Sequence, residues 1–513
     1  MDFKQIISHC KEYGFVYQSS EIYDGLSAVY DYGPNGVNLK NNLKQYWWRS
    51  MVQMHENIVG LDSAIFMHPK TWKASGHVDA FNDPLIDNKD SKKRYRADQL
   101  IEGYTDKIEA KIKKDVEKAR KKFDDFDEKM FRETNGRIVD RQKKIDDVLG
   151  RMNSMLASED LEGVKNLIEE LEIACPESGS RNWTDVRQFN LMFNTQLGNI
   201  AGEDGKLYLR PETAQGIFVN FLNVSKTSRQ KIPFGIAQIG KAFRNEIVAR
   251  QFIFRMREFE QMEMQFFVRP GTEMEWYNTW KEKRMKWHEA IGSPAEKLRF
   301  HNHENLAHYA NAAADIEFEF PFGFKELEGI HSRTDFDLGA HQELSGKKLQ
   351  YFDPELDKNY VPYVVETSIG ADRMFLSQVS HCLREEEVPD AEGKSSTRIV
   401  MKFHPAIAPI KCAVLPLLKN HEGLVNASKD ICDKLRLAVE VQYDEKDAIG
   451  RRYRRQDAIG TPFCVTVDHQ SLEDNTVTLR DRDSLEQTRI SIDEINSQVL
   501  AKTSMENLLL STK

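Results

Sequence analysis

The chain has 513 residues, of which 40% are hydrophobic and 30% are charged, and its formal net charge is -9. This composition predicts two to four globular domains with substantial cores and excludes a disordered tail protein. The negative charge argues against a protein that coats nucleic acid non-specifically, but it leaves room for local basic patches.

The sequence favours a cytoplasmic protein with no membrane segment. No stretch approaches the roughly 18 to 20 uninterrupted apolar residues of a membrane span, and the N-terminus MDFKQIISHCKEYGF lacks a signal-peptide apolar region. The six cysteines have no paired spacing, so they predict reduced thiols with neither a disulfide framework nor a zinc site.

The first 85 residues predict the start of a folded domain. They mix amphipathic helical pattern with turn signals such as YGPNG at 32 to 36. The segment LKNNLKQYWWRSMVQMHENIVG, 39 to 60, is typical of a helix that is stopped by a glycine, here Gly60.

Residues 100 to 173 predict a charged helical insertion. Apolar side chains from Tyr104 to Met130 recur at spacings of three and four among dense charges, and a second helical run follows Asn135-Gly136. Two interpretations stay open: an arm that faces RNA or a partner, and a solvated helical hairpin packed on the body.

Strand-like sequence returns from about 181 to 403, interrupted by a helix expected from Glu273 to Ala290. The three tryptophans of that helix, Trp276, Trp280 and Trp287, are expected in the core. REEEVPDAEGKSSTR, 384 to 398, indicates a loop or linker. An apolar strand, a helix around 419 to 435 and the strands VTVD and TVTLRDRD then predict a separate C-terminal α/β domain.

The stretch GKAFRNEIVARQFIFRMREFEQMEMQFF, 240 to 267, predicts a pair of strands with charges on one face. Successive strand side chains point to opposite faces, so Arg244 and Glu246 share one face of the first run. In the second run Phe259 and Glu263 fall on a polar parity that opposes four apolar side chains. A sheet with one solvated face and cross-strand ion pairs would show the same alternation.

Three further segments combine arginine with carboxylates at the ends of apolar runs. They are RPETAQGIFVNF at 210 to 221, FKELEGIHSRTDFDL at 324 to 338 and YVVETSIGADRMFL at 363 to 376, whose expected helix holds Arg373 in its first turn. Buried charges are costly unless they are paired or used, and a polyanion together with a zwitterion would use them. No Walker A sequence and no GxGxxG follows a predicted strand, so P-loop and Rossmann nucleotide sites are unsupported.

These motifs together resemble the class II aminoacyl-tRNA synthetases, and their wording is similar to the homodimeric glycyl-tRNA synthetases. The resemblance rests on VYDYGPNGVNLKNNL, RPETAQG, FRNE followed by REFEQMEMQFF, and ETSIGADRMF, in this order. Residues 444 to 483, which contain RRYRR, are similar to the family's anticodon-binding domain.

The resemblance implies an α+β fold: a catalytic domain on an antiparallel sheet flanked by helices, a helical insertion and a C-terminal α/β anticodon-binding domain. The expected boundaries are 1–99 and 174–403 for the two parts of the catalytic domain, 100–173 for the insertion and 404–513 for the anticodon-binding domain. Motif 1 forms a dimer interface in this class, so a homodimer is expected.

The resemblance also implies an ATP site with Arg244, Glu246 and Arg373 as catalytic residues. Arg244 would contact the α-phosphate and the glycine carboxylate, Glu246 the adenine edge and Arg373 the γ-phosphate, while Phe259 would stack on adenine. Glu326 would hold Mg²⁺ or ATP. The remaining ATP-binding positions would be Asn245, Phe254, Arg255, Met256, Arg257, Glu258, Leu327, Gly370, Ala371 and Asp372.

For glycine, the resemblance implies the acids Glu212, Glu263 and Glu366 together with Ser368 and Arg96. The neighbouring positions Phe259, Glu260, Gln261, Met262, Thr367, Ile369 and Gly370 would complete the site. Several acids around one ammonium group compensate its desolvation, and a pocket filled up to the α-carbon would exclude larger amino acids sterically.

The reaction implied is glycine activation by ATP to glycyl-adenylate and pyrophosphate, followed by transfer to tRNA(Gly). In-line positioning and charge stabilisation suffice, because the glycine carboxylate is already a nucleophile. His331 and His341 are interpreted as structural. RRYRR, interpreted as a Gly-bounded loop, would contact RNA through Arg451, Arg452, Tyr453, Arg454 and Arg455.

Some relatives carry zinc-type cysteines near residues 174 to 194, whereas this chain has only Cys175 there, so no zinc is expected. Two rival functions remain: a catalytically inactive RNA-binding regulator, and a class II synthetase for serine, threonine or proline. The regulator predicts a broken Arg244, Glu246 or Arg373, and all three are present. A synthetase for serine, threonine or proline is opposed by the acids Glu212, Glu263 and Glu366 and by the absence of a cysteine or histidine placed for zinc-assisted recognition of a side chain.

Overall fold

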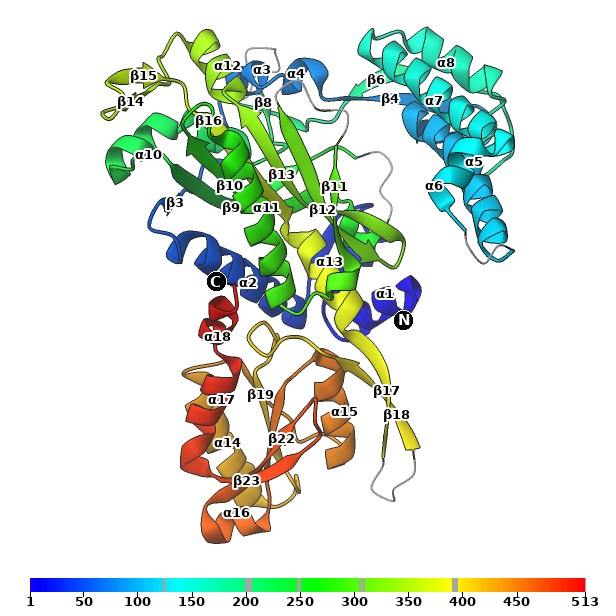
Figure 1. Cartoon of the computed structure of the whole chain (residues 1–513). Helices are drawn as coiled ribbons and strands as arrows, with labels where there is room; N and C mark the ends of the chain where they lie inside the picture. Colours follow the sequence, from blue (N-terminus) through cyan, green and yellow to red (C-terminus); the bar gives the residue numbers. More distant parts are fainter. Residues whose placement is uncertain are drawn as a thin grey trace. The chain divides into compact units, whose positions relative to one another are not determined.

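In a computed structural model, the chain forms two compact units (Figure 1). The first comprises Met1–Ser75, Phe193–Arg244 and Arg250–Lys513, and the second comprises Gly76–Met192 and Asn245–Ala249. The residues described are 1–122, 126–198, 205–246, 251–303, 306, 310–389 and 395–512. No helix in these ranges is both long and apolar enough to cross a membrane.

A seven-stranded sheet with the order β11-β12-β13-β16-β10-β9-β3 is the centre of the first unit. All neighbouring strands are antiparallel except β3 and β9, which are parallel. The strands are β3 (Ile58–Gly60), β9 (Phe234–Phe243), β10 (Glu258–Val268), β11 (Leu298–Asn302), β12 (Ala312–Phe320), β13 (Gly323–Thr334) and β16 (Tyr363–Gly370).

One face of this sheet is covered by helices α2 (Pro34–Trp48), α11 (Glu273–Ala290) and α13 (Ala371–Cys382). Met262, Met264 and Phe266 of β10 join apolar side chains of these helices in the main hydrophobic core. Figure 1 shows α11 and α13 lying across the strands. The opposite side chains of β10, which include Gln261, Glu263 and Gln265, therefore face away from that core.

The remaining elements of the first unit that precede its C-terminal part are short. Its other helices are α1 (Phe3–Glu12), α3 (Pro69–Ala74), α9 (Ala214–Val219), α10 (Phe221–Ser228) and α12 (Phe336–Ser345). Its two-stranded sheets are β1 (Val16–Gln18) with β2 (Tyr30–Tyr32), β7 (Asn194–Gln196) with β8 (Lys206–Tyr208), β14 (Tyr351–Asp353) with β15 (Lys358–Tyr360), and β17 (Leu383–Pro389) with β18 (Ser395–Met401).

The C-terminal part of the first unit is an α/β domain on a five-stranded sheet of order β20-β19-β21-β22-β23. The strands β20, β19 and β21 are parallel, and β22 and β23 are antiparallel. The elements are β19 (Cys412–Pro416), α14 (Glu422–Arg436), β20 (Val441–Tyr443), α15 (Ile449–Ile459), β21 (Phe463–Val467), α16 (His469–Asp474), β22 (Thr476–Asp481), β23 (Gln487–Ser491), α17 (Ile495–Thr503) and α18 (Met505–Leu510).

In its described residues, the second unit combines a three-stranded sheet with five helices. The sheet has the order β5-β4-β6, and one core joins Ile86 and Tyr95 of the strands to Ile101, Val148 and Leu167 of the helices. The elements are α4 (His77–Ala80), β4 (Asn82–Asn88), β5 (Lys93–Arg96), α5 (Ala97–Arg120), α6 (Glu128–Thr134), α7 (Gly136–Ala157), α8 (Leu161–Glu170) and β6 (Arg187–Asn190).

Several predicted elements are confirmed. Helix α11 has the expected bounds, and Trp280 and Trp287 are buried in the core while Trp276 packs against it. The parity predicted for β10 holds, and Arg373 lies in the first turn of α13. The expected break at Asn135-Gly136 is an N-cap, because the Asn135 side chain accepts a hydrogen bond from the amide of Ile138 in α7.

The prediction that the first strand of the charged pair contains Arg244 and Glu246 is wrong. Strand β9 ends at Phe243, so Arg244 and Glu246 follow it instead of alternating within it. The ladder pairs the upstream residues 234 to 243 with β10, because both faces of FGIAQ are buried there. The connection predicted from Val248 to Phe254 lies partly outside the described residues, and its described end is a 3₁₀ turn at Phe252–Phe254.

Three further local predictions are wrong. Helix α2 and the π turn Arg49–Gln53 end before Gly60, which lies in β3. The expected linker 384–398 contributes to the β17–β18 hairpin, where Glu386 pairs with Arg398 across the strands at 2.8 Å. RRYRR lies in α15 instead of a loop, since the helix continues to Gly460, whose φ of 84° suits a glycine cap.

Candidate functional site

The predicted acids meet on neighbouring strands of the first unit. In the sheet register Glu263 of β10 lies opposite Ser368 of β16, and Gln265 lies opposite Glu366. On the other side of β10, Glu263 lies opposite Gln238 of β9. The two acids are therefore close neighbours on the polar face of the sheet, and both are nearly fully buried.

Neutral groups hold the Glu263 carboxyl. The Thr213 hydroxyl lies 2.6 Å from Oε2, and the Ser368 hydroxyl and the Gln261 amide nitrogen lie 2.7 and 3.0 Å from Oε1. Burial, together with the nearby charges of Glu366 and Glu212, raises the pKa of Glu263 to about 8.

Cations hold the Glu366 carboxylate instead. Arg333 Nη1 donates to its Oε2 at 3.0 Å, His331 Nδ1 lies 2.9 Å from the same oxygen, and Gln265 donates to Oε1 at 2.9 Å. Burial alone would raise the pKa of Glu366, but Arg333 and His331 hold that pKa well below its usual range. The same contact with Glu366 raises the pKa of His331, against the effect of its own burial.

A second layer of hydrogen bonds surrounds the acids. Arg333 forms a two-point contact with Asp337, at 2.8 and 3.1 Å. Gln215 donates to both Glu212 and Asp337 at 3.0 Å and lies 2.8 Å from His341. This layer orients Glu212 beside the two strand acids, and we name Glu212, Glu263 and Glu366 the acid cluster.

Arg210 fixes the segment that carries Glu212 and Thr213. Its guanidinium is buried and donates to the carbonyls of Lys241 at 2.6 Å and Ser63 at 2.8 Å. A side chain at Gly240 would overlap that guanidinium, so a glycine is needed where Arg210 crosses the sheet.

Arg244 and Phe259 form the predicted nucleotide side. The guanidinium of Arg244 lies 5.3 Å from the centroid of the Phe259 ring and donates to the carbonyl of Pro211 at 3.1 Å. Phe259 is half-buried. A planar base can stack on such a ring while the arginine beside it meets a phosphate.

Arg373 and Glu326 form an ion pair at 3.0 Å, and Arg373 also packs on the Phe254 ring at 4.4 Å from its centroid. The Arg373 charge lowers the pKa of Glu326, whose side chain is 51% exposed. An exposed carboxylate beside an arginine offers an oxygen ligand of the kind that Mg²⁺ prefers. Among the described residues, no group of three or more His, Cys, Asp or Glu side chains could hold a metal ion by itself.

Other predicted site residues make structural contacts. Asp372 accepts hydrogen bonds from Lys40 at 2.7 Å, from the Glu260 amide at 2.8 Å and from the Tyr32 hydroxyl, and Glu260 also pairs with Lys40. The Arg257 guanidinium donates to the carbonyl of Ser27. Six of the predicted positions have side chains in the main hydrophobic core: Phe254, Met256, Met262, Leu327, Ile369 and Ala371.

The other predicted positions of the first unit differ in their burial and in their place within the elements. Glu258 pairs with Lys241 at 2.9 Å on an exposed part of the sheet, and Arg255 follows the 3₁₀ turn. Thr367 is buried in β16, and Gly370 is the N-cap of α13.

Arg96, Asn245 and Glu246 belong to the second unit. Arg96 pairs with Asp83 at 2.8 Å and with Asp98 at 2.5 Å, and the charge of Glu246 is among the groups that raise the pKa of Arg96. The Asn245 amide donates to the carbonyl of Leu191 at 2.8 Å. These three predicted substrate positions therefore share one region of their own unit.

The RRYRR residues on α15 are largely occupied within the domain. Arg452 is buried against backbone carbonyls, including that of Asp447, and Arg455 pairs with Asp444 and Asp447 at 2.8 Å. The Tyr453 hydroxyl lies 2.6 Å from that of Thr466. Arg454 contacts Ser396, and Arg451 is exposed.

Among the described residues, sequence reasoning missed five side chains that contact the acid cluster: Thr213, Gln215, Gln265, His331 and Arg333. His331 was interpreted as structural, although it contacts Glu366 directly. The spacing of Arg333 and Asp337 at i and i+4 was visible, but only the structure shows that Arg333 also reaches Glu366, at 3.0 Å. In the sheet register His331 lies opposite Glu366, and Arg333 falls at a register shift. Glu328, two positions from Glu326 on β13, is buried with Arg284 and His288 away from the acid cluster.

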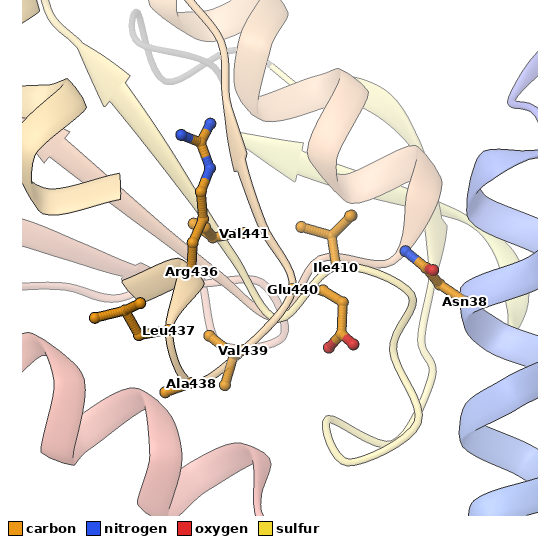
Figure 2. A pocket seen from close by; sticks show the side chains of 8 residues that line it. All are labelled: Asn38, Ile410, Arg436, Leu437, Ala438, Val439, Glu440 and Val441. Atoms are coloured by element: carbon orange, nitrogen blue, oxygen red, sulfur yellow. The ribbon is translucent and has the colours of Figure 1, made fainter. Parts of the chain in front are cut away.

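A separate cavity of about 460 Å³ lies where α2 meets the C-terminal domain. Figure 2 shows the residues that line it, which are Asn38 of α2, Ile410 and residues 436–441. None of the acid-cluster residues lines it, so this cavity is separate from the acid cluster.

Family models match three parts of the chain. They are described as a glycyl-tRNA synthetase insertion domain 1 at residues 83–191, a class II tRNA synthetase core domain (G, H, P, S and T) at 198–382, and an anticodon binding domain at 411–502.

Curated proteins match almost the whole chain. A glycine-tRNA ligase of Chlorobaculum tepidum is 50% identical over 489 residues, which are 95% of this chain and 97% of that protein. Glycine-tRNA ligases of Staphylococcus haemolyticus and Treponema denticola are 48% and 47% identical, each over 98% of this chain and over 99% and 97% of their own lengths.

Proposed function

The chain belongs to the glycine-tRNA ligase family of class II aminoacyl-tRNA synthetases, and from this membership we propose how its residues carry out the reaction. Its activity is that of a glycine-tRNA ligase that uses ATP, glycine and tRNA(Gly). The observation that carries the proposal is the acid cluster, whose Glu263 and Glu366 are buried on β10 and β16, beside an arginine-rich nucleotide side.

The acid cluster binds the ammonium group of glycine. Three carboxyl groups and the Ser368 hydroxyl supply hydrogen-bond acceptors on the polar face of the sheet, which compensates the loss of water around a cation. Because the pocket floor is formed by buried strands, an added side chain on the α-carbon would clash.

ATP binds with adenine on the Phe259 ring and its phosphates near Arg244 and Arg373. The glycine carboxylate attacks the α-phosphorus, and the bond to pyrophosphate breaks to give glycyl-adenylate. Arg244 stabilises the charge on the α-phosphate, and Arg373 holds the departing γ-phosphate. Mg²⁺, held by Glu326 and the ATP phosphates, would neutralise phosphate charge when bound.

In the second step the terminal ribose hydroxyl of tRNA(Gly) attacks the glycyl carbonyl, and AMP leaves. The C-terminal domain is proposed to bind the anticodon, with Arg451 as the exposed member of RRYRR. The proposal includes a homodimer through motif 1, a cytoplasmic location and the division into 1–99, 100–173, 174–403 and 404–513. The family-model matches at 83–191, 198–382 and 411–502 support the order of an insertion, a core domain and an anticodon-binding domain.

Amino-acid-dependent ATP–pyrophosphate exchange without tRNA tests the proposal. We expect exchange with glycine and background rates with alanine, serine, threonine and proline. Exchange with none of them, in folded protein that still binds tRNA, would contradict glycine activation and favour an RNA-binding regulator.

A further inference from the structure

The cations that contact the two strand acids of the cluster lie on Glu366. Arg333 and His331 both contact Glu366, and Arg333 divides its guanidinium between Glu366 and Asp337. No arginine, lysine or histidine among the described residues forms an ion pair with Glu263. A second buried carboxylate beside Glu366 and Glu212 is therefore costly in its ionised form.

The groups around Glu263 come from four segments. Gln238 lies beside it on β9 and Ser368 on β16; Arg210, Glu212 and Thr213 approach from the segment before α9; His331 and Arg333 belong to β13. The Arg210 guanidinium is occupied by the carbonyls of Ser63 and Lys241. The direct neighbours of the Glu263 oxygens are therefore neutral.

A proton on Glu263 is compatible with these contacts. The hydroxyls of Thr213 and Ser368, at 2.6 and 2.7 Å, can each accept a hydrogen bond as well as donate one. The raised pKa of Glu263 agrees with this state. In addition, the Oε1 atoms of Gln261 and Gln265 are buried and accept no hydrogen bond from any described residue. The pocket thus offers buried acceptors that await N–H donors.

Resting on the proposed glycine site, we propose that Glu263 carries a proton in the empty pocket and that the ammonium group of glycine displaces it. Glycine enters as a zwitterion with three N–H donors, Glu263 loses its proton to solvent, and the resulting carboxylate pairs with the ammonium. Arg333 is a positioning residue that keeps Glu366 ionised, so that the two acids have different states before glycine arrives. Net charge in the pocket is unchanged by the exchange of a proton for an ammonium group.

Proton release can be counted by calorimetry. Glycine is titrated into the full-length protein at pH 6.5 and 8.5, in buffers with different ionisation enthalpies. Free glycine is already an ammonium ion at pH 6.5, so released protons come from the protein. We expect about one proton per glycine at pH 6.5 and a small fraction at pH 8.5, because the pKa of Glu263 is about 8. The apparent Kd for glycine should rise about tenfold per pH unit below that value.

Infrared difference spectroscopy identifies the group. Glycine should remove the C=O stretching band of a protonated carboxyl in the wild-type protein. That band should be absent from Glu263→Gln, which keeps the neutral, hydrogen-bonding character of the site, and present in the exposed control Glu319→Gln. Glycine binding with no proton release, or a band that persists in Glu263→Gln, overturns this inference and leaves the proposed function intact. Absence of any glycine binding overturns the proposed function itself.

Discussion

At the scale of single residues, neighbours set the ionisation of the two strand acids. Glu263 and Glu366 are the same residue type, and both are nearly fully buried. Arg333 and His331 lower the pKa of Glu366, whereas Glu263 has only neutral partners and a pKa raised by burial. A carboxylate that is always charged and one that responds to its ligand thus lie side by side.

The raised pKa of Glu263 predicts a pH-dependent stability. A carboxyl whose pKa rises on folding, from its ordinary 4.5 to about 8, stabilises the fold fully below about pH 4.5 and loses this contribution as the pH rises through 8. We expect the urea midpoint of the wild type, relative to Glu263→Gln, to fall between pH 5 and 8.5. A difference that stays constant over this range would contradict the prediction, and saturating glycine should abolish the fall.

Arg373 is predicted to act mainly on the nucleotide. Replacing it in Arg373→Gln removes the charge that pairs with Glu326 at 3.0 Å and is proposed to hold the γ-phosphate. We expect kcat/KM for ATP in pyrophosphate exchange to fall by a factor of about 10² to 10³, as for the loss of one transition-state contact. The exposed control Arg299→Gln, which loses the pair with Glu317 and the contact with the Phe324 ring, should stay within about twofold.

At the scale of elements, a buried ion pair ties α2 to α13 and β10. Lys40 of α2 bridges Asp372, in the first turn of α13, and Glu260 of β10, while the Asp372 carboxylate also accepts the Glu260 amide. Arg373 follows Asp372 directly, so this contact sets the position of an arginine proposed to bind ATP. The expected motif 1 helix is thereby connected to the nucleotide side within one chain.

Lys40→Met should therefore be strongly destabilising. Removing one partner of a buried pair leaves Asp372 uncompensated, at a cost of about 3 to 5 kcal/mol in the free energy of unfolding. Lys44→Met, which removes a more exposed partner of Glu260, should cost about 1 kcal/mol or less. Chemical denaturation measures both, and equal effects would show that Lys40 contributes only as a surface charge.

Gly240 of β9 is predicted to tolerate no side chain. In Gly240→Ala the new methyl group would overlap the buried Arg210 guanidinium, which would have to give up its carbonyl contacts. We expect a loss of about 1 to 3 kcal/mol in the free energy of unfolding, measured by denaturation. The control Gly339→Ala in α12, where a methyl group meets nothing within 4 Å, should be neutral or stabilising.

At the scale of the whole molecule, the acid cluster and the proposed nucleotide side lie in the first unit, and the helices of the second unit contain no proposed activation residue. The second unit has two hydrophobic clusters along its helices. Ile86, Tyr95 and Trp183 belong to the cluster that includes the sheet, whereas Ile112 and Ile138 belong to another cluster of α5 and α7.

Shortening the helical hairpin of the second unit should leave activation intact. Replacing residues 112–145 by a short glycine linker removes the cluster around Ile112 and keeps the one around Ile86. We expect pyrophosphate exchange with glycine within about twofold of the wild type, since no proposed activation residue is removed. A lost exchange activity in folded protein would contradict this. The KM for tRNA(Gly) is measured in parallel. Removal of an RNA-facing arm would raise this KM, whereas removal of a solvated hairpin would leave it unchanged.

Motif order, strand parity and helix periodicity made much of the fold predictable. The bounds of α11, the polar parity of β10 and the place of Arg373 follow from local patterns, because periodicity is a property of consecutive residues. The end of β9 and the β17–β18 hairpin did not follow, because ladder partners decide where a strand stops. The loop predicted for RRYRR is wrong, because a run of basic residues is polar in a loop and in a helix alike. Only the structure shows that these residues lie in α15 and that Arg452 donates to the backbone carbonyl of Asp447.

By itself the sequence determined the family and the class of fold, and it predicted the acids that are proposed to meet an ammonium group, since each rests on residue type and order. Only the tertiary structure decided that Arg333 and His331 contact Glu366 while Glu263 has neutral partners, and that Lys40 reaches Asp372. These pairs are 33, 35 and 332 positions apart in the chain. Ionisation depends on distances between such groups, and distance across a sheet is fixed by register and packing, which no local pattern encodes.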